Sequence, residues 1–251
     1  MPVPISLVSV NVEGERHLDL VTPFLKKLGP EVVCMQELFE ADVSALEAVL
    51  GPCFFVPMML HKSVRGLLPW GIGIFSRLPL RQSFSLQYAG REEDSLAPFD
   101  TTSLVTRYRT QKYPLVVVKI GKEDSDFTIA TTHFPWTPDG RPNDFQRESL
   151  AALFAALDGI GEFVLCGDFN APRGMEIFDT IAGRYKDTIP SEYKTSLDGS
   201  LHRVGLEVFT KEGMDTFMVD GLFSTPEYDV REVSLVNGVS DHCAIVATIC
   251  R

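Results

Sequence analysis

The sequence lacks the features of several large classes of protein. No apolar run is long enough to span a bilayer, and no stretch rich in Pro, Gly or Ser divides the 251 residues into parts. The N-terminal stretch MPVPISLVSVNVEGE has no basic segment ahead of an apolar one, so no secretory signal is indicated. We therefore expect a single domain over residues 1–251, without a membrane span, monomeric and cytoplasmic.

Three kinds of catalytic or binding motif are also missing. There is no GxSxG elbow, which disfavours serine nucleophile chemistry, and no GxxxxGK[ST] loop, which disfavours nucleotide-driven chemistry. No CxxC pair occurs among the five cysteines, and an odd number within mainly apolar runs predicts buried free thiols rather than disulfides or a zinc site. These cysteines are Cys34, Cys53, Cys166, Cys243 and Cys250.

An excess of positive charge is absent as well. The chain has 34 acidic and 23 basic residues, for a formal net charge of −11. This charge argues against a broad electropositive surface for non-specific binding of nucleic acid, but it does not exclude a local basic groove.

Short apolar runs rich in β-branched residues dominate what is present. They predict strands at ISLVSVNV, EVVCMQE, GIGIFS, LVVVKI, FTIATTH, FVLCGDFN, FMVDGLFS, VREVSLV and CAIVATI. Helical periodicity predicts helices over residues 17–29, 41–51 and 145–159. Many strands with a few helices indicate two packed sheets flanked by helices, and residues 90–106 are expected to form a long loop.

Polar side chains recur where these predicted strands end or begin. Each has an ordinary structural explanation, such as a turn capped by Asp168, a buried core histidine at His133 or an Asx turn at Asp241. Together they indicate a common polar rim, because strands of one sheet can bring their ends to the same edge. The set is Asn11, Gln36, Glu37, His133, Asp168, Asn170, Asp220, Asp241 and His242.

Such a rim suits phosphoryl chemistry assisted by a hard cation. Carboxylate and amide oxygens favour Mg²⁺, for which Mn²⁺ can substitute, and Glu37 is the leading candidate ligand. Asp168 is suited to orient or deprotonate an attacking water. His133 and His242 can donate hydrogen bonds to phosphate oxygens, and an adjacent carboxylate at Asp220 or Asp241 would keep a histidine protonated.

The ordered set SVNV, VVCMQE, GIGIFSRLPL, TTH, GDFN, VDGLF and SDH resembles the endonuclease/exonuclease/phosphatase superfamily, whose fold is DNase I-like. The resemblance covers nearly the whole chain. It implies an α+β fold, a four-layer α/β/β/α sandwich of two mostly antiparallel sheets flanked by helices. It also implies Mg²⁺-dependent cleavage of a phosphate ester by direct attack of water.

The same resemblance assigns roles to individual residues. It implies metal ligation by Glu37, with Asn11 and Asp241 close to the metal, and water activation by Asp168. It further implies phosphate contacts by Asn170 and His133, and stabilisation of the pentavalent phosphate by His242 paired with Asp220. Asn11 is also expected to contact substrate.

Two details refine the resemblance. The TTH motif, which ends in His133, resembles the branch that has a histidine at this place. That branch includes DNase I, tyrosyl-DNA phosphodiesterases and deadenylases, but not the abasic-site endonucleases. Gly221 departs from the family pattern, which has a bulky residue after the aspartate, and this departure puts substrate contacts in question.

Substrate-selecting residues are expected in loops beside the motifs. Arg173 and Trp136 are the favoured candidates, for phosphate binding and stacking, ahead of Trp70, Phe134, Arg141 and Arg147. The main hypothesis is a phosphodiesterase or nuclease, similar to tyrosyl-DNA phosphodiesterases. The alternatives are a phosphatase or phosphodiesterase for a small phosphorylated metabolite or lipid head group, and a non-catalytic binding module.

Overall fold

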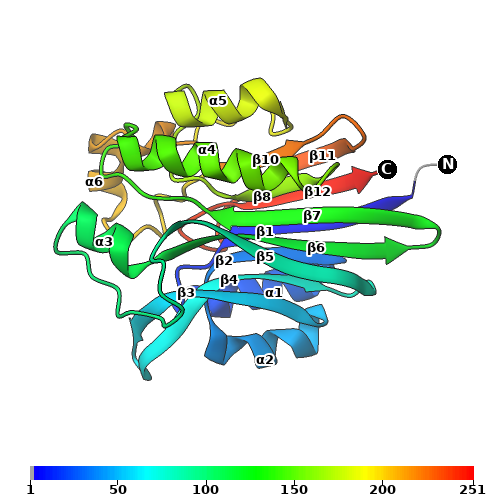
Figure 1. Cartoon of the computed structure of the whole chain (residues 1–251), viewed down its shortest axis with the longest axis horizontal. Coiled ribbons are helices and arrows are strands. Elements are labelled where there is room, and N and C mark those ends of the chain that lie inside the picture. Colours follow the sequence, from blue (N-terminus) through cyan, green and yellow to red (C-terminus); the bar gives the residue numbers. More distant parts are fainter. Residues whose placement is uncertain (1–2) are drawn as a thin grey trace.

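A computed structural model describes residues 3–251 and contains two six-stranded sheets (Figure 1). The first sheet has the order β11-β12-β1-β2-β4-β3. Its strands β1 and β2 are parallel, and its other neighbours are antiparallel. The bounds are β1 Pro4–Asn11, β2 Val32–Phe39, β3 Cys53–Ser63, β4 Gly66–Ser76, β11 Asp229–Val236 and β12 Ala244–Cys250.

The second sheet has the order β5-β6-β7-β8-β10-β9 and the same mixed character. Here β7 and β8 are the parallel pair. The bounds are β5 Leu80–Gly90, β6 Lys112–Lys122, β7 Ser125–His133, β8 Val164–Asp168, β9 Lys186–Asp187 and β10 Asp220–Ser224.

Helices cover the outer face of each sheet, and this confirms the four-layer α+β sandwich (Figure 1). Helices α1 (Leu18–Leu28) and α2 (Glu40–Leu50) pack on the first sheet through an apolar layer. Helices α4 (Asp144–Asp158) and α5 (Glu176–Arg184) pack on the second. The short helices α3 (Leu104–Thr110) and α6 (Leu206–Lys211), with a 3₁₀ turn at Met214–Thr216, lie at the end of the sandwich opposite the chain termini.

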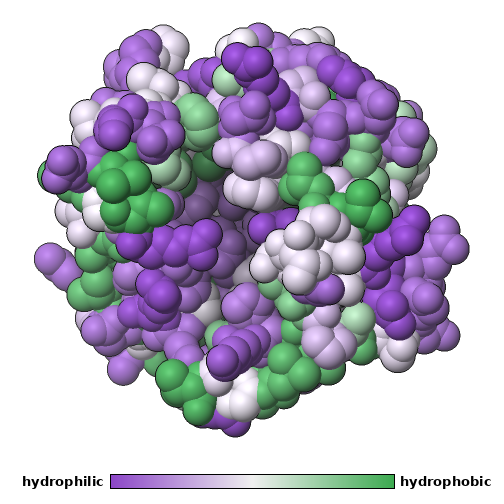
Figure 2. Space-filling model, turned by 90° about the vertical axis from the view of Figure 1, so that its left-hand side faces the viewer, coloured by the Kyte–Doolittle hydropathy of each residue, from purple (hydrophilic) through white to green (hydrophobic). Residues whose placement is uncertain are grey.

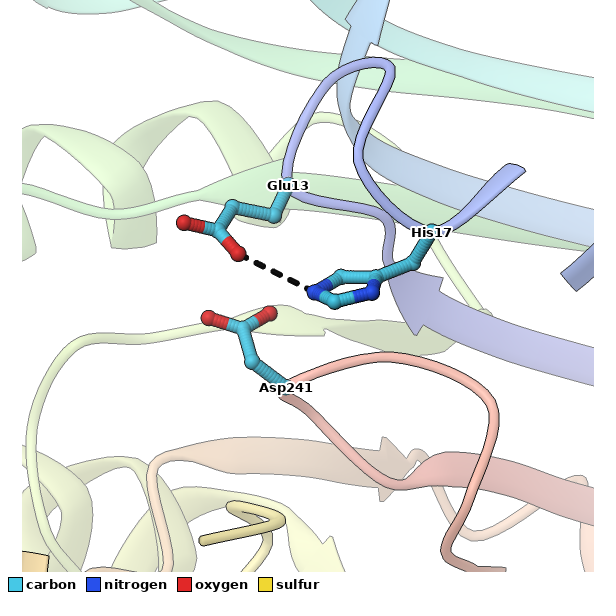
Figure 3. A group of neighbouring side chains, drawn as sticks. All are labelled: Glu13, His17 and Asp241. Atoms are coloured by element: carbon cyan, nitrogen blue, oxygen red, sulfur yellow. Dashed lines mark hydrogen bonds and ion pairs between the residues drawn. The ribbon is translucent and has the colours of Figure 1, made fainter. Parts of the chain in front are cut away.

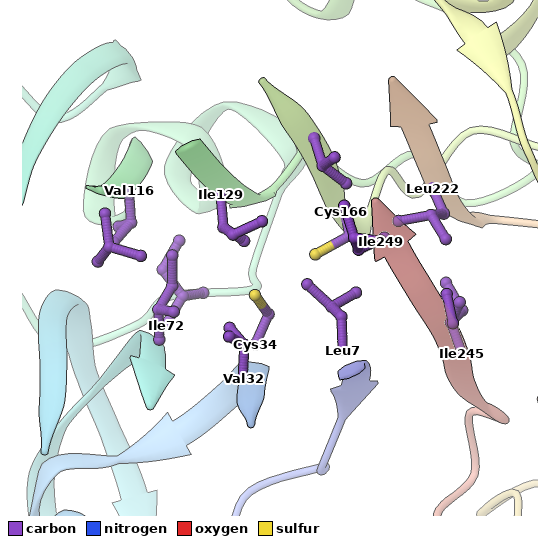
Figure 4. Close-up of a cluster of buried hydrophobic side chains, with 14 of the residues drawn as sticks. Leu7, Val32, Cys34, Ile72, Val116, Ile129, Cys166, Leu222, Ile245 and Ile249 are labelled. Atoms are coloured by element: carbon purple, nitrogen blue, oxygen red, sulfur yellow. The ribbon is translucent and has the colours of Figure 1, made fainter. Parts of the chain in front are cut away.

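The largest apolar core fills the space between the two sheets. Figure 4 shows side chains of both sheets meeting there, among them Leu7 and Cys34 on one side and Ile129 and Cys166 on the other. All five cysteines are free thiols, as the sequence predicted, and four of them are buried as expected, whereas Cys53 is only partly buried. Removal of this apolar surface from water is the main stabilising contribution to such a fold.

The structure confirms the nine predicted strands and three predicted helices and adds elements that the sequence did not indicate. Strands β3, β5 and β9 and helices α3, α5 and α6 are the additions. The expected loop at residues 90–106 is wrong at its C-terminal end, because Ser103 and Thr106 form a capping box that starts α3. No helix within residues 3–251 is long and apolar enough to cross a membrane.

Candidate active site

The strand register brings the predicted polar residues to one edge of the sandwich. In the second sheet, Asp168 at the end of β8 is paired with His133 of β7 on one side and with Asp220 of β10 on the other. In the first sheet, Asn11 at the end of β1 is paired with Gln36 of β2. Side chains in register on neighbouring strands lie about 5 Å apart, so the pairing itself assembles the rim.

A cleft with a volume of about 580 Å³ opens over this rim. Figure 2 shows it as a hollow lined by hydrophilic residues on the end of the molecule that carries α3 and α6. Six of the predicted residues line it: Glu37, His133, Asp168, Asn170, Asp241 and His242. A volume of this size accommodates a ligand of several hundred daltons.

Asp168 lies at the centre of the polar cluster and is almost fully buried. Its Oδ2 atom is 3.1 Å from Nδ2 of Asn11, 3.5 Å from Nε2 of His133 and 3.9 Å from Nε2 of His242. Burial raises the pKa of the Asp168 carboxyl, whereas the nearby His242 lowers it. The side chains of Asn11, His133 and His242 therefore converge on one carboxylate oxygen, Oδ2 of Asp168.

The backbone between Asp168 and Asn170 is a turn and not an extended segment. Asn170 has a φ of 48°, in the left-handed region, and its N–H donates to Oδ1 of Asp168 at 2.8 Å. Nδ2 of Asn170 donates to the Phe134 carbonyl at 2.9 Å. Asp168 thus caps its own turn with one oxygen while the other faces the cluster, so the capping explanation accounts for Oδ1 alone.

Glu37 reaches the cleft because β2 is irregular at that point. The register with β4 shifts between Met35 and Leu38, and Glu37 has a φ of 61°. A positive φ at a residue other than glycine is strained, and such strain is common at functional sites. Oε1 of Glu37 accepts a hydrogen bond from Nδ2 of Asn11 at 3.0 Å.

The charge at Glu37 is poorly compensated by the protein. Burial raises its pKa to about 7, the charges of Asp241 and Asp168 act in the same direction, and the hydrogen bond from Asn11 opposes them. Concentrated carboxylate charge of this kind fits a bound divalent cation. The residues present therefore suit Mg²⁺ or Mn²⁺.

His242 is held by a buried carboxylate. Its Nδ1 lies 2.7 Å from Oδ2 of Asp220. Burial lowers the pKa of His242, but the charges of Asp220 and Asp168 outweigh this and place the pKa well above its ordinary value. Ser196 fixes the start of β10, since its hydroxyl accepts hydrogen bonds from the N–H groups of Val219 and Asp220, both at 3.0 Å.

His133 has the opposite protonation. Burial is the main cause that lowers its pKa to about 4, and the charge of Arg107 contributes, so the imidazole is neutral at pH 7. Its Nε2 faces Asp168 and lies 3.8 Å from Oε1 of Glu37. Its Nδ1 is buried and has no hydrogen-bond partner within residues 3–251.

The role of Asn11 beside the metal stays a prediction. Its Oδ1 accepts a hydrogen bond from the Glu13 N–H at 3.1 Å, so the amide presents its NH₂ group to Glu37 and Asp168. In this arrangement Asn11 hydrogen-bonds to two carboxylates of the rim.

Glu13 and His17 are residues of the rim that sequence reasoning missed. Nε2 of His17 lies 3.1 Å from Oε2 of Glu13, and Figure 3 shows both side chains converging on Asp241. These three offer possible ligand atoms within 4.8 Å of one another. The stretch VEGERH directly follows β1, and its charged residues and histidine were the available signal.

The family model of the endonuclease/exonuclease/phosphatase family matches residues 8–242 of the chain. The chain belongs to this family. The match runs from β1 to His242 and so includes every rim residue described above. Compared with the sequences of curated proteins, the chain has no significant match.

Several solved structures share the fold at low sequence identity. The catalytic domain of human Nocturnin with a bound sulfate anion has a TM-score of 0.72, 16% identity, and coverage of 98% of this chain and 93% of that one. ANGEL2, a 2′,3′-cyclic phosphatase, has a TM-score of 0.65, 18% identity, and coverage of 99% and 96%. A mannosyl-6-phosphatase from Bacteroides thetaiotaomicron has a TM-score of 0.67, 10% identity, and coverage of 98% and 99%.

The departure of this family member at Gly221 concerns packing. Gly221 is paired with Gly167 of β8. A Cβ added to Gly221 would lie 2.4 Å from the Phe223 ring and 2.8 Å from the Phe169 ring. Both phenylalanines belong to the apolar layer under α4 and α5. The position therefore faces the helices and does not line the cleft.

Of the expected substrate selectors, only the two tryptophans line this cleft. Trp136 is partly exposed, whereas Trp70 is buried and packs against His133, with ring centroids 5.7 Å apart. Arg141 lies in a neighbouring groove and Phe134 in the core.

The structure does not bring Arg173 or Arg147 to the cleft. The guanidinium of Arg173 is bound to Asp187 at 2.8 Å and to the carbonyl of Ile189 at 3.0 Å, so it links β9 to the following loop. Arg147 pairs with Glu176 at 2.6 Å on the helical surface.

Several cleft residues come from segments without a sequence signal. They are His61, Lys62, Phe99, Arg107, Gln111, His202 and Arg203. Arg107 lies on α3, one residue beyond the segment that was expected to be a loop. Helix α3 has only seven residues, which is too short for helical periodicity to be read from the sequence.

Proposed function

We propose that this protein is a Mg²⁺-dependent phosphoesterase that hydrolyses a phosphodiester by in-line attack of water, acting as a single domain. The observation that carries the proposal is the position of Asp168 Oδ2, with an amide and two imidazoles within 3.9 Å. Family membership and the phosphatases among the similar structures support a phosphate-ester substrate.

Glu37 would hold the ion, with Asp241 close by as a second carboxylate. When bound, Mg²⁺ would neutralise charge that develops on phosphate and leaving-group oxygens. Asn11 holds the Glu37 carboxylate in place through its 3.0 Å hydrogen bond. Mn²⁺ has the same preference for oxygen ligands and would substitute.

The chain's own residues would handle the protons. Asp168 would orient the attacking water and accept its proton, since its raised pKa makes the carboxylate a better base. His242, kept protonated by Asp220, would donate to the phosphate. His133, which is neutral, would donate one hydrogen bond, and Asn170 would add a contact without charge.

Two grooves meeting at the same residues favour a diester over a monoester. A second groove of about 570 Å³ shares Trp136, Asn170 and His242 with the cleft. Its remaining walls are largely apolar and include Leu197, Met214 and Phe217. A phosphorus atom at the junction could therefore carry an organic group on each side.

The test is hydrolysis of matched esters with Mg²⁺, Mn²⁺ or EDTA. The panel compares bis-p-nitrophenyl phosphate with p-nitrophenyl phosphate and a 5′-tyrosyl oligonucleotide with single-stranded DNA and RNA. We expect metal-dependent turnover with diesters preferred. A preference for monoesters would support the metabolite phosphatase, and tight binding without turnover would support a binding module.

A second candidate, hydrolysis of a lipid head group, is favoured by apolar side chains around the cleft. Figure 2 shows hydrophobic residues around the hollow, and Leu67, which lines the cleft, is 50% exposed. Val64, in the turn between β3 and β4 that precedes Leu67, is 91% exposed. The substitution Val64→Asp should then reduce turnover of a phosphodiester in micelles but not of a soluble one, with Leu28→Asp on α1 as control.

A further inference from the structure

Arg107 is an uncompensated cation in the wall of the cleft. Its guanidinium stacks on Trp136 at 4.5 Å and on Phe99 at 5.0 Å, measured from Cζ to the ring centroids. Within residues 3–251 it has no hydrogen-bond or ion-pair partner, and its Nε is buried without one. A guanidinium has five N–H donors. Burying such a group without partners costs free energy unless an anion binds to it.

Neighbouring polar groups are also unpartnered. Gln111, one turn further along the chain, lines the cleft at 3% exposure, and its Oε1 has no partner within the described chain. The Tyr113 hydroxyl is buried and likewise has no partner within the described residues, and the charge of Arg107 opposes the rise of the Tyr113 pKa that burial causes. Buried polar groups are normally paired, so these groups beside one cation indicate a missing ligand. Because Gln111 Oε1 is an acceptor, that ligand must carry a donor such as a hydroxyl as well as an anionic group.

The surroundings of Arg107 favour an anion in spite of the acidic chain. Lys62 and Arg203 also line the cleft and are exposed. Burial together with the charges of Arg107 and Arg203 lowers the pKa of His61, another cleft residue. The carboxylates in the cleft wall belong to the rim. Burial lowers the pKa of Arg107, and of these carboxylates Glu37 has the charge that opposes the lowering.

We propose that Arg107 and Gln111 form a subsite for a second phosphoryl group of the substrate. The inference rests on the proposed function, since it places the scissile phosphate at Asp168. A phosphoryl group offers three acceptor oxygens, which match the guanidinium fork and the amide donors of Gln111 better than a neutral group does. The substrate class is therefore a phosphate ester that carries another phosphate, either a free one or the next one of an oligonucleotide.

The experiment compares esters that differ only in the second phosphate. The p-nitrophenyl ester of thymidine 5′-phosphate is assayed without a 3′ substituent, with a 3′-phosphate, and with a 3′-linked second nucleotide. We expect kcat/KM to rise about 10- to 100-fold with either addition, the gain of one charge-assisted contact. A gain from the 3′-phosphate alone would identify a small bisphosphate, and a gain from the nucleotide alone would identify an oligonucleotide. No gain from either would overturn the proposal.

Two variants on one helix separate the subsite from general charge. Arg107→Gln should abolish most of the gain, measured as the ratio of kcat/KM between the substituted and the unsubstituted ester. Arg109→Gln removes the same charge from an exposed position outside the cleft and should keep the gain. Equal loss on all esters for Arg107→Gln would contradict the proposal. If Arg107→Gln does not fold, the wild-type comparison decides.

Binding provides a readout that does not depend on turnover. Calorimetry with adenosine 3′,5′-bisphosphate and with adenosine 5′-monophosphate should show tighter binding of the bisphosphate, which Arg107→Gln removes. If no ester is hydrolysed but this difference persists, the phosphoesterase proposal fails and the anion site stands. If hydrolysis occurs without the difference, the anion site fails alone.

Discussion

Nδ1 of His242 lies 2.7 Å from Oδ2 of Asp220, and this contact joins the loop before β12 to the start of β10. The two residues are 22 positions apart in the sequence, and Asp220 is buried whereas His242 is partly buried. The contact holds one imidazole in its charged form at the edge of the cleft. Loss of the Asp220 carboxylate should therefore lower the fraction of His242 that is protonated.

Asp220→Asn should lower the pKa of His242, because Asp220 is the nearest negative charge that raises it. The imidazole then loses its proton at lower pH. The fall of kcat on the alkaline side of its pH profile should therefore shift to lower pH. We expect kcat at pH 8 to fall about 10²- to 10⁴-fold. NMR titration of His242 checks the pKa directly. Asp229→Asn, at an exposed surface pair, should alter neither quantity.

Asp168→Asn should separate activity from stability. The amide keeps the shape of the side chain but cannot accept a proton, so kcat should fall about 10²- to 10⁴-fold. Burial raises the pKa of Asp168 in the folded protein, so its ionised form destabilises the fold at neutral pH. The variant should therefore have an unchanged or higher Tm. A wild-type rate in this variant would refute the role of Asp168.

Glu37 should make the metal-free protein less stable as pH rises. Its folded-state pKa of about 7 exceeds the ordinary 4.5, so its contribution is fully present below pH 4.5 and is lost as pH rises through 7. In EDTA at pH 8, Glu37→Gln should raise Tm by several degrees, at about 2–4 °C per kcal/mol. Thermal unfolding with and without Mg²⁺ checks this. An equal Mg²⁺-induced rise of Tm in wild type and variant would exclude Glu37 as a ligand.

Metal binding should also release a proton. Below a pH of about 7 the cation must displace the Glu37 proton, so apparent Mg²⁺ affinity should fall by up to about tenfold per pH unit. Calorimetry in two buffers of different ionisation enthalpy counts the protons released. An affinity that does not change between pH 8 and 5.5 would contradict ligation by Glu37.

Gly221→Ala should destabilise the fold by about 1–3 kcal/mol, since the added methyl overlaps Phe223 and Phe169. Gly183→Ala is the matched control, because it lies within α5 and nothing lies within 4 Å of its Cβ position. That control should be neutral or stabilising. Denaturant unfolding of both variants measures the difference, and equal stability would remove the packing explanation.

Local sequence signals predicted the strands and their polar ends well. The β-branched runs around Asn11, His133 and Asp168 form strands as expected, and register then brings their ends together. Strand β5, LRQSFSLQYAG, was missed because it lies at a sheet edge and carries many polar residues.

Features that depend on tertiary contacts were beyond reach of the sequence. The bulge that turns Glu37 inward and the turn at Asn170 follow from packing and hydrogen bonds between strands. Arg173 looked suited to phosphate because its partner Asp187 lies fourteen positions away on β9. The sequence did not indicate Arg107 as a cleft residue, because α3 is too short to show helical periodicity. The assignment of this protein to the histidine-containing branch, its monomeric state and its cytoplasmic location stay predictions.

The most direct measurement is the initial rate of bis-p-nitrophenyl phosphate hydrolysis by the wild-type protein in Mg²⁺ and in EDTA, alongside Asp168→Asn. The arrangement of Glu37, Asp168 and His242 predicts turnover with Mg²⁺, restoration by Mg²⁺ after chelation, and loss of at least about 10²-fold in the variant. Equal rates in Mg²⁺ and EDTA, or an Asp168→Asn variant as active as wild type, would contradict a metal-dependent phosphodiesterase centred on Asp168.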